Sequence, residues 1–344
     1  SAEYDIRSQE LKVMGIPYII VADAKITPEN NEVLILENSK IGTLYNTTII
    51  LDTLNGYHQL KNGVIDIISR NEFSGHATYL YKNALDQVYE IEMRDFHLQS
   101  VTDTVASSGG LFGIKGPQTS LHTVAYGSVM EEDNILVSPG FYFKGGMVLY
   151  AHKPAMELDG YVKLDFKNSD TYDTWINYNS SADQKEVIIP YEGETTQDGR
   201  KLDAGLHFSS LDNKLYSNFL EGKRGVGDDD FFTPGGNLFF SVTSNEFIIE
   251  DPKKAAGESY QGKVYAFNEA TSDIRFEGPL TFFAPKKDVS ITASGIGLGN
   301  IKTNEYSINS FLAIDFPVVV QAFQQMAIDF IDIIENTGVP EGLG

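Results

Sequence analysis

The chain has 344 residues, and its 48 acidic and 26 basic side chains give a formal net charge of −22. A balance this acidic argues against nucleic acid and anionic membrane surfaces as partners, and fits a solubilising surface or a basic partner. Apolar residues make up 42% of the chain, and the 31 glycines, 18 tyrosines and 21 phenylalanines favour strands and tight turns. Cysteine is absent, which excludes disulfides and thiolate metal sites. No apolar run approaches the roughly 18 residues of a transmembrane helix.

The first part of the sequence carries short apolar runs, four to six residues long, bounded by Asn, Gly, Pro or Asp. This punctuation is typical of strands joined by turns. The runs lie at 17–21, 33–36, 47–51, 64–68, 77–81 and 88–93. We therefore predict an N-terminal β region over residues 1–104, followed by a loop or hinge over 105–120, where the apolar pattern lapses.

A second β region is predicted over residues 121–314. It is interrupted by a polar insert, 168–230, which holds the single tryptophan, Trp175, and ends in three consecutive aspartates at 228–230. Strand-like sequence resumes at 238–240 and 247–249 and continues to about Ile301. The fold class predicted is mainly β, with stacked antiparallel strand pairs in an elongated jellyroll, solenoid or sandwich-like arrangement.

One local pattern recurs: an aromatic residue, a spacer and a glycine open an alternating strand at 73–75, 143–145 and 260–262. In the last two copies a polar turn and a second strand with its own glycine, Gly160 or Gly278, follow. We interpret each as a hairpin in which glycine relieves crowding at a bend or bulge and the aromatic ring packs across the pair. The uneven spacing excludes a strict tandem repeat.

The segment 315–337 is predicted to be an amphipathic helix. Asp315 and Pro317 suit a first turn, and Gly338 and Pro340 suit a stop. Apolar residues recur at alternating steps of three and four, at 320, 323, 327, 330 and 334. We expect the helix to pack as a cap on an open sheet edge. The chain starts without an initiator Met or apolar leader and stops after the helix, so we expect a fragment or processed form of a longer polypeptide.

No catalytic, cofactor-binding or metal-binding residue is predicted. The six histidines lack metal-site spacing, although His76 and His97 could approach across a hairpin. There is no serine elbow, and the glycines at 295–299 do not lead into a helix that would bind phosphate. Two acidic clusters, 131–133 and 228–230, leave a calcium site or a catalytic carboxylate pair open. Asn46 and Asn179 begin glycosylation sequons.

The runs 141–150 with 156–164, and 236–240 with 276–282, carry a family resemblance. They resemble large β-rich cell-envelope proteins of Bacteroidota. More loosely, they are similar to the β-jellyroll repeats of lipopolysaccharide-transport (OstA-like) proteins, in which strand pairs stack into a twisted groove. The Leu-x-Gly-x-Val-x-Leu strand of that pattern matches residues 158–164. Stacked pairs would place Val148, Tyr150, Val162 and Leu164 on one face, as a core or an apolar groove.

These observations favour a non-enzymatic scaffold or binding segment of a larger secreted or periplasmic protein. The resemblance implies an exported chain, periplasmic or associated with the outer membrane, with protein partners in the envelope and no transmembrane helix. One alternative is a groove that handles lipid or lipopolysaccharide. A second is a glycan-binding or carbohydrate-active protein that uses aromatic and acidic residues near Trp175, and a third is a hydrolase.

Overall fold

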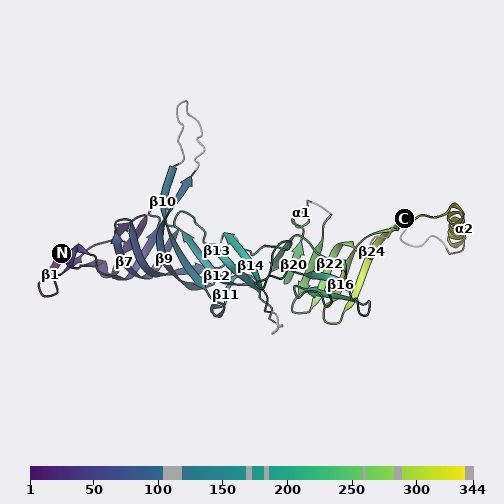
Figure 1. Cartoon of the computed structure of the whole chain (residues 1–344), viewed down its shortest axis with the longest axis horizontal. Helices are drawn as coiled ribbons and strands as arrows, with labels where there is room; N and C mark the ends of the chain where they lie inside the picture. The colour runs from purple at the N-terminus through teal and green to yellow at the C-terminus, as the bar shows by residue number, and fades with distance from the viewer. Residues whose placement is uncertain (104–117, 168–172, 182–185, 259–260, 283–288, 338–344) are drawn as a thin grey trace, which may run out of the picture. The chain divides into compact units, whose positions relative to one another are not determined.

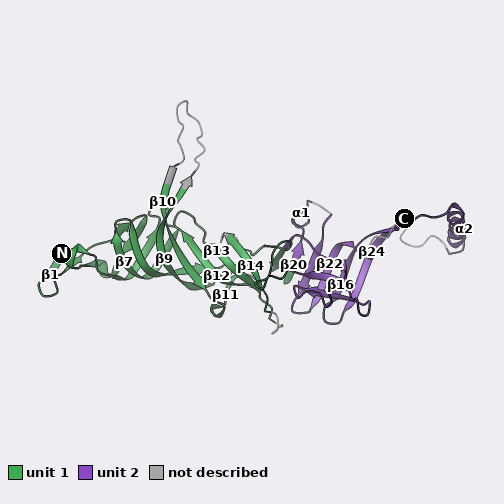
Figure 2. Cartoon of the chain, in the orientation of Figure 1, with its two compact units in different colours: residues 1–201, 238–247 green, residues 202–237, 248–344 purple. Residues whose placement is uncertain are grey.

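The computed structural model describes residues 1–103, 118–167, 173–181, 186–258, 261–282 and 289–337. These residues divide into two compact units, which Figure 2 colours separately: 1–201 with 238–247, and 202–237 with 248–344. Antiparallel sheets dominate both units, and Figure 1 shows few helices, so the predicted mainly-β class is confirmed. The only helices of more than three residues among the described segments are α1 (Pro252–Ala255) and α2 (Val320–Thr337).

Unit 1 begins with a small sheet of order β1-β2-β5, formed by β1 (Ala2–Asp5), β2 (Glu10–Met14) and β5 (Glu32–Ile35). A large eleven-stranded sheet follows, with order β14-β13-β12-β10-β9-β8-β7-β6-β4-β3 and with β11 also paired to β12. Its strands are β3 (Ile19–Val21), β4 (Ala24–Thr27), β6 (Leu44–Leu51), β7 (His58–Ser69), β8 (Glu72–Lys82), β9 (Val88–Asp103), β10 (Gln118–Val129), β11 (Ile135–Ser138), β12 (Phe141–Tyr150), β13 (Glu157–Leu164) and β14 (Trp175–Ser181). Three 3-10 turns, Glu29–Asn31, Glu37–Ser39 and Glu131–Asp133, punctuate the connections.

The large sheet is strongly curved, and two polar contacts join strands that are far apart in its order (Figure 1). In the turn between β3 and β4, Asp23 accepts hydrogen bonds from the main-chain N–H of Thr123 on β10, at 3.0 and 3.1 Å, and from the Thr123 hydroxyl. His58 on β7 donates from Nε2 to the carbonyl of Lys153, just beyond β12, at 2.8 Å. Burial lowers the pKa of His58, which suits a neutral ring in this position.

The inner face of this curved sheet forms the core of unit 1. Residues of alternating position on each strand are buried there, as period-two patterning requires. On β12 the buried residues are Phe141, Phe143, Met147 and Leu149, and on β7 they include His58, Leu60 and Ile65. The short apolar runs of the sequence thus become strands that bury one side each.

The recurrent glycines lie where two strands of a hairpin approach closely. Gly145 on β12 is opposite Gly160 on β13, and a Cβ at Gly145 would lie 2.6 Å from both the Asp159 carbonyl oxygen and the Gly160 Cα. Gly145 also has a φ of +140°, which L side chains rarely adopt. In the third copy, a Cβ at Gly278 would lie 2.9 Å from the carbonyl oxygen of Gly262. The predicted role of these glycines, relief of crowding within a hairpin, is therefore confirmed for these two copies.

Two further sheets complete the chain. A seven-stranded sheet has the order β15-β19-β20-β21-β22-β23-β24, and a three-stranded sheet has the order β17-β16-β18. The strands are β15 (Ile189–Pro190), β16 (Ala204–Phe208), β17 (Leu215–Phe219), β18 (Asp229–Phe232), β19 (Asn237–Ser241), β20 (Glu246–Glu250), β21 (Val264–Asn268), β22 (Asp273–Leu280), β23 (Ser290–Asn300) and β24 (Glu305–Asp315). Five strands, β14 to β18, thus begin within the predicted polar insert.

Within unit 2, aromatic side chains pack the three-stranded sheet against β21 and β22. The ring of Phe232 lies 5.3 Å from that of Phe276, and Phe219 stacks on Phe267 at 4.9 Å. Tyr265 is fully buried between the layers, and its hydroxyl donates to the carbonyls of Gly205 and Asn218 at 3.3 and 2.9 Å. The apolar layer and this polar anchor together fix how the small sheet sits on the larger one.

Most of the predicted hinge at 105–120 lies outside the described residues, and the strands before and after it, β9 and β10, are neighbours in one sheet. The compact units divide at 201–202 and around 238–247. The C-terminal helix begins at Val320, because residues up to Asp315 belong to β24.

Alanine at Gly145 should destabilise unit 1. The substitution combines a left-handed backbone with overlap against the facing strand, so we expect the free energy of unfolding to fall by about 2–4 kcal/mol. Alanine at the next residue, Gly146, is the matched control, because its Cβ would meet nothing closer than 3.5 Å, and it should change stability by less than about 0.5 kcal/mol. Urea denaturation followed by the fluorescence of Trp175 measures both. Equal effects would contradict the assignment of a special role to Gly145.

Candidate functional site

The end of the seven-stranded sheet carries an unusual amount of exposed apolar surface. β24 is the last strand in the sheet order, and it pairs with β23 along its whole length, from Glu305 to Asp315. Phe311 is 79% exposed. The other exposed apolar side chains of the hairpin are Ile296, Leu298, Leu312 and Ile314. By the strand register, Ile296, Leu298 and Phe311 share one face of the hairpin, and Leu312 and Ile314 share the other. Scattered exposed apolar residues are normal, whereas several on one face mark an interaction surface or an aggregation hazard.

Helix α2 follows β24 in the chain and also carries exposed apolar side chains. All of its described side chains, residues 320–333, are exposed, and Phe323 is 64% exposed. The expectation that the helix is packed as a cap is therefore wrong for the chain on its own. Most of its apolar residues nevertheless lie on one side, whereas Ile328 lies among the polar residues of the other side, where Gln325 is bonded to Asp329 at 2.8 Å. We call the exposed apolar residues of β23, β24 and α2 the C-terminal surface; they are Ile296, Leu298, Phe311, Leu312, Ile314, Val320, Phe323, Met326, Ile328, Phe330, Ile331 and Ile333.

The C-terminal surface is acidic at its margins. From residue 303 to 337 the chain has no Lys, Arg or His, while Glu305, Asp315, Asp329, Asp332 and Glu335 are acidic. An apolar patch edged by one sign of charge prefers a partner of opposite or neutral character. The surface is thus unsuited to an anionic lipid headgroup.

The turn of the β23–β24 hairpin is held by the small sheet of unit 2 and the loop that follows β17. The hydroxyl groups of Tyr306 and Ser217 lie 2.9 Å apart, and Arg224 donates to the Asn304 side-chain oxygen at 3.1 Å. Leu312 and Ile314 are exposed near the opposite end of the hairpin, and Leu312 lies opposite Ala293. The hairpin is therefore anchored at its turn and exposes these two apolar side chains near its other end.

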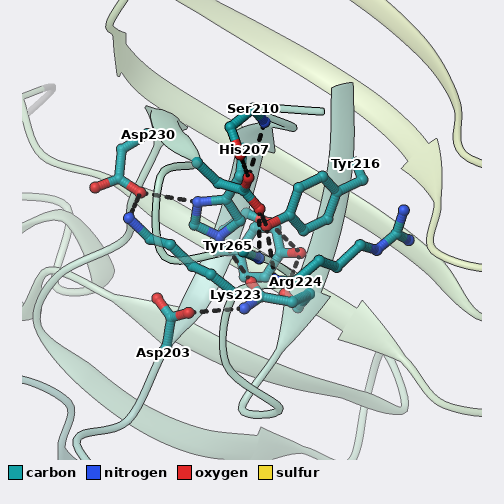
Figure 3. Close-up of polar contacts among 12 residues, drawn as sticks. Asp203, His207, Ser210, Tyr216, Lys223, Arg224, Asp230 and Tyr265 are labelled. Carbon is teal, nitrogen blue, oxygen red and sulfur yellow. Dashed lines mark hydrogen bonds and ion pairs between the residues drawn. The ribbon is translucent and has the colours of Figure 1, made fainter. Parts of the chain in front are cut away.

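A buried polar network orders the small sheet itself (Figure 3). His207 on β16 is fully buried, with Nδ1 2.8 Å from an Asp230 oxygen and Nε2 3.0 Å from the Asn218 side-chain oxygen. The Asn218 amide nitrogen donates to Asp203 at 2.9 Å, which fixes its oxygen toward the histidine. Each ring nitrogen of His207 therefore has a side-chain oxygen within hydrogen-bond distance. Asp230 also pairs with Lys223 at 2.6 Å, which ties the loop after β17 to β18.

A second part of the network is centred on Asp228. Its carboxylate accepts hydrogen bonds from the main chain of Ser210 at 2.8 Å, the Ser210 hydroxyl at 2.9 Å, the Tyr216 hydroxyl at 2.6 Å and the main chain of Gly225 at 2.8 Å. Chiefly the Ser210 N–H, and then the Tyr216 hydroxyl, hold the pKa of Asp228 far below its usual range. Burial, aided by the hydrogen bond to Asp228, raises the pKa of Tyr216 to about 12. These bonds fasten the loop that joins β17 to β18.

The acidic clusters singled out in the sequence have partners within the chain. Asp228 and Asp230 are engaged as described, and Glu131 pairs with Lys144 and Lys163, each at 3.1 Å. Within the part of the chain that the structure describes, no group of three or more His, Asp or Glu side chains is placed to hold a metal ion. Glu131, Asp228 and Asp230 therefore hold neighbouring segments of the chain together through ion pairs and hydrogen bonds.

One arrangement that sequence analysis missed resembles a serine–histidine–aspartate relay. Ser120 Oγ is 2.8 Å from Nε2 of His122, and an Asp23 oxygen is 3.5 Å from Nδ1. A working relay needs the carboxylate to accept a hydrogen bond from the imidazole. Here the hydrogen bonds that Asp23 accepts come from Thr123, and the Nδ1 atom of His122 is buried without a hydrogen-bond partner. The cluster therefore serves to close the curved sheet.

The other candidate residues lie apart or in the core. His97 is opposite Val124 and stacks on Tyr126 with ring centres 5.5 Å apart, while His76 pairs with Val64, so the two histidines do not meet. Trp175 is 6% exposed. It lies under the ammonium groups of Lys144 and Lys163, at 4.2 and 4.9 Å from the ring centre. A glycan site built on an exposed Trp175 is not supported.

The expected apolar face of the β12–β13 hairpin is also wrong. The register places Val162 opposite Phe143 and Leu164 opposite Phe141, whereas Val148 lies opposite Glu157. Directly opposed residues share a face, so Val148 and Tyr150 lie on the face opposite to Val162 and Leu164. Val162 and Leu164 are buried in the core, and the other two are half-buried. The four residues do not line a common groove.

Comparison with known protein families, curated proteins and solved structures finds no match to this chain. Among the described helices, none is both long enough and apolar enough to cross a membrane.

Asp228→Asn should destabilise unit 2 in a pH-dependent way. Because the folded-state pKa of Asp228 is lowered from its ordinary 3.8, its stabilising effect is complete above that value and is lost as the pH falls through the folded-state pKa. The difference in unfolding free energy between wild type and Asp228→Asn should be largest near neutral pH and shrink below about pH 4. Urea unfolding followed by circular dichroism tests this. Asp229→Asn, at an exposed neighbour, is the control, and an equal, pH-independent loss in both variants would refute the assignment.

Proposed function

We propose that this chain is a non-enzymatic scaffold or binding segment of an exported cell-envelope protein, and that it holds a protein partner on its C-terminal surface. The observation that carries the proposal is the exposure of all described residues of α2, 320–333, next to an open edge strand with exposed apolar residues. Fully burying one Leu, Ile, Phe or Met side chain gains about 1.5–3 kcal/mol. Covering this surface would thus provide ample free energy for a specific complex.

The remaining architecture supports a holding role. The large sheet of unit 1 is closed by Asp23 and His58, and unit 2 is fixed by the His207 and Asp228 networks. The networks of unit 2 support the sheet that carries the C-terminal surface. The acidic margin of the surface favours a partner with neutral or basic groups.

The exported location rests on the resemblance of the strand pairs at 141–164 and 236–282 to envelope proteins of Bacteroidota. Fractionation of the source cells measures it directly. Recovery of the protein in the periplasmic or outer-membrane fraction is the expected result, and recovery with the cytosol would contradict this part of the proposal.

Site-specific photo-cross-linking tests the docking role. Benzoylphenylalanine at Phe323, on the apolar side of α2, should give a discrete protein adduct when the chain is incubated with an envelope fraction from the source cells. The same residue at Gln325, on the polar side two positions away, should give little or none. Native mass spectrometry of the wild-type protein then separates a protein complex from a lipid complex. Adducts of equal yield at both positions, or adducts with lipid alone, would contradict a protein-docking face.

A further inference from the structure

We propose that β24 pairs antiparallel with β24 of a second copy of this chain, about a twofold axis at Ser310, so that two seven-stranded sheets become continuous. This inference rests on the proposed function, because it names a partner for part of the C-terminal surface. Twofold dimers are the commonest form of homo-oligomer, and they require a surface that is complementary to itself. The edge of β24 meets that requirement.

The outer edge of β24 lacks the devices that normally protect an edge strand. Protected edges are short, bulged, covered, or carry Pro or Lys. β24 is eleven residues long, pairs with β23 without a register shift, and contains neither Pro nor Lys. No hydrogen bond to the main chain of residues 305–315 other than those of the β23 ladder is found among the described residues. Its free N–H and C=O groups form a ready template for another strand.

The pleat of the strand restricts how two copies can pair. Along β24, main-chain groups point alternately toward β23 and toward the open edge, and only the second set can bond to a new strand. Opposed residues in an antiparallel pair must therefore both be even-numbered or both odd-numbered. A pairing centred on Ser310 satisfies this condition, and it places each of the eleven residues opposite a partner.

The same register matches side chains well. It sets Tyr306 opposite Ile314 of the second copy, and Ile308 opposite Leu312, with Ser310 opposite itself. These even-numbered residues share one face of the hairpin, and Leu312 and Ile314 are exposed on it in the single chain. Aromatic–aliphatic and aliphatic cross-strand pairs each contribute roughly 0.2–1 kcal/mol beyond the ladder itself.

The ends of the proposed ladder carry the one unfavourable feature. Glu305 lies opposite Asp315 of the second copy, so two pairs of like charges face each other. Like charges directly opposed weaken a strand pair, and salt screens exposed charges. Removing one of these charges with Asp315→Asn, or adding salt, should therefore strengthen the dimer several-fold.

Disulfide trapping tests the register with a matched pair of variants. The chain has no cysteine, so a single thiol reports one position. With Ser310→Cys, two thiols lie across the twofold axis, at a Cβ separation of about 4.5–5.5 Å that small movements bring within disulfide range. Copper phenanthroline in air should link most of the protein into dimers, each disulfide forming as dioxygen removes the two thiol hydrogens. With Ser307→Cys, also exposed on β24, the two thiols lie roughly 20 Å apart, so dimers should be rare.

Light scattering of the full-length wild-type chain over a range of concentrations completes the test. A concentration-dependent dimer together with linkage at 310 but not at 307 is the expected result. A monomer at all concentrations, linkage at neither position, or equal linkage at both would overturn the proposal. If the chain is monomeric but benzoylphenylalanine at Phe323 still captures another protein, self-pairing fails while the docking function stands. If the chain dimerises but gives no Phe323 adduct, self-pairing stands and the docking function of α2 fails.

Discussion

Main-chain N–H and C=O groups at the ends of a sheet need hydrogen-bond partners, and this constraint explains much of the architecture. In unit 1, the terminal strand β14 is covered by residues 195–197, whose main chain bonds to Asn177 and Trp175 at 3.0 and 2.7 Å. The opposite end of the same sheet is β3, which is only three residues long. In unit 2, β18 is met by the main chain of Thr281, which donates to Phe231 at 2.8 Å. β24 stands apart from all of these, since it is long and regular and no described residue bonds to its outer edge.

Curvature is the second consequence of the same constraint. A large sheet must twist, and a strongly twisted sheet either curls or splits. Asp23 and His58 stabilise the curl by joining strands that are not neighbours in the sheet order. Each contact satisfies a polar group that burial would otherwise leave without a partner, because Asp23 accepts the N–H of Thr123 and His58 meets the carbonyl of Lys153. The polar closure and the apolar core therefore depend on each other.

Local features of this structure were predictable from the sequence, while contacts between distant segments were not. The apolar runs and the paired glycines, such as Gly145 and Gly160, report local geometry, because strand period and turn chemistry act over a few residues. The Asp23–Thr123 contact joins residues 100 positions apart, and no periodicity encodes it. The face of Val148 relative to Val162 depended on the hairpin register, and a shift of one residue reverses every face.

The buried network around His207 shows the same limit for the candidate site. Its members lie in a segment whose polar composition indicated an irregular insert, yet β16 is buried on both faces and every charged group has an oppositely charged or hydrogen-bonding partner. A short strand such as β16, which carries His207 in the interior, has no period-two signal, since burial of both faces removes it. The only hint in the sequence was the density of Asp beside Ser, Gly and Tyr, residues that donate hydrogen bonds to carboxylates.

The apolar side of helix α2, like the open edge of β24, needs a partner. The amphipathic pattern correctly indicated a helix with one apolar side, but the step from an apolar side to a packed helix assumed that its cover lies in the same chain. The described residues of α2 have no such cover, and the strand before it has an open edge. Because β24 and α2 follow one another in the chain and both expose apolar side chains, we expect both to be covered in the same assembly. A strand edge supplies directional hydrogen bonds and fixes register, whereas a helix side supplies area without fixing register, so the two together specify a partner better than either alone.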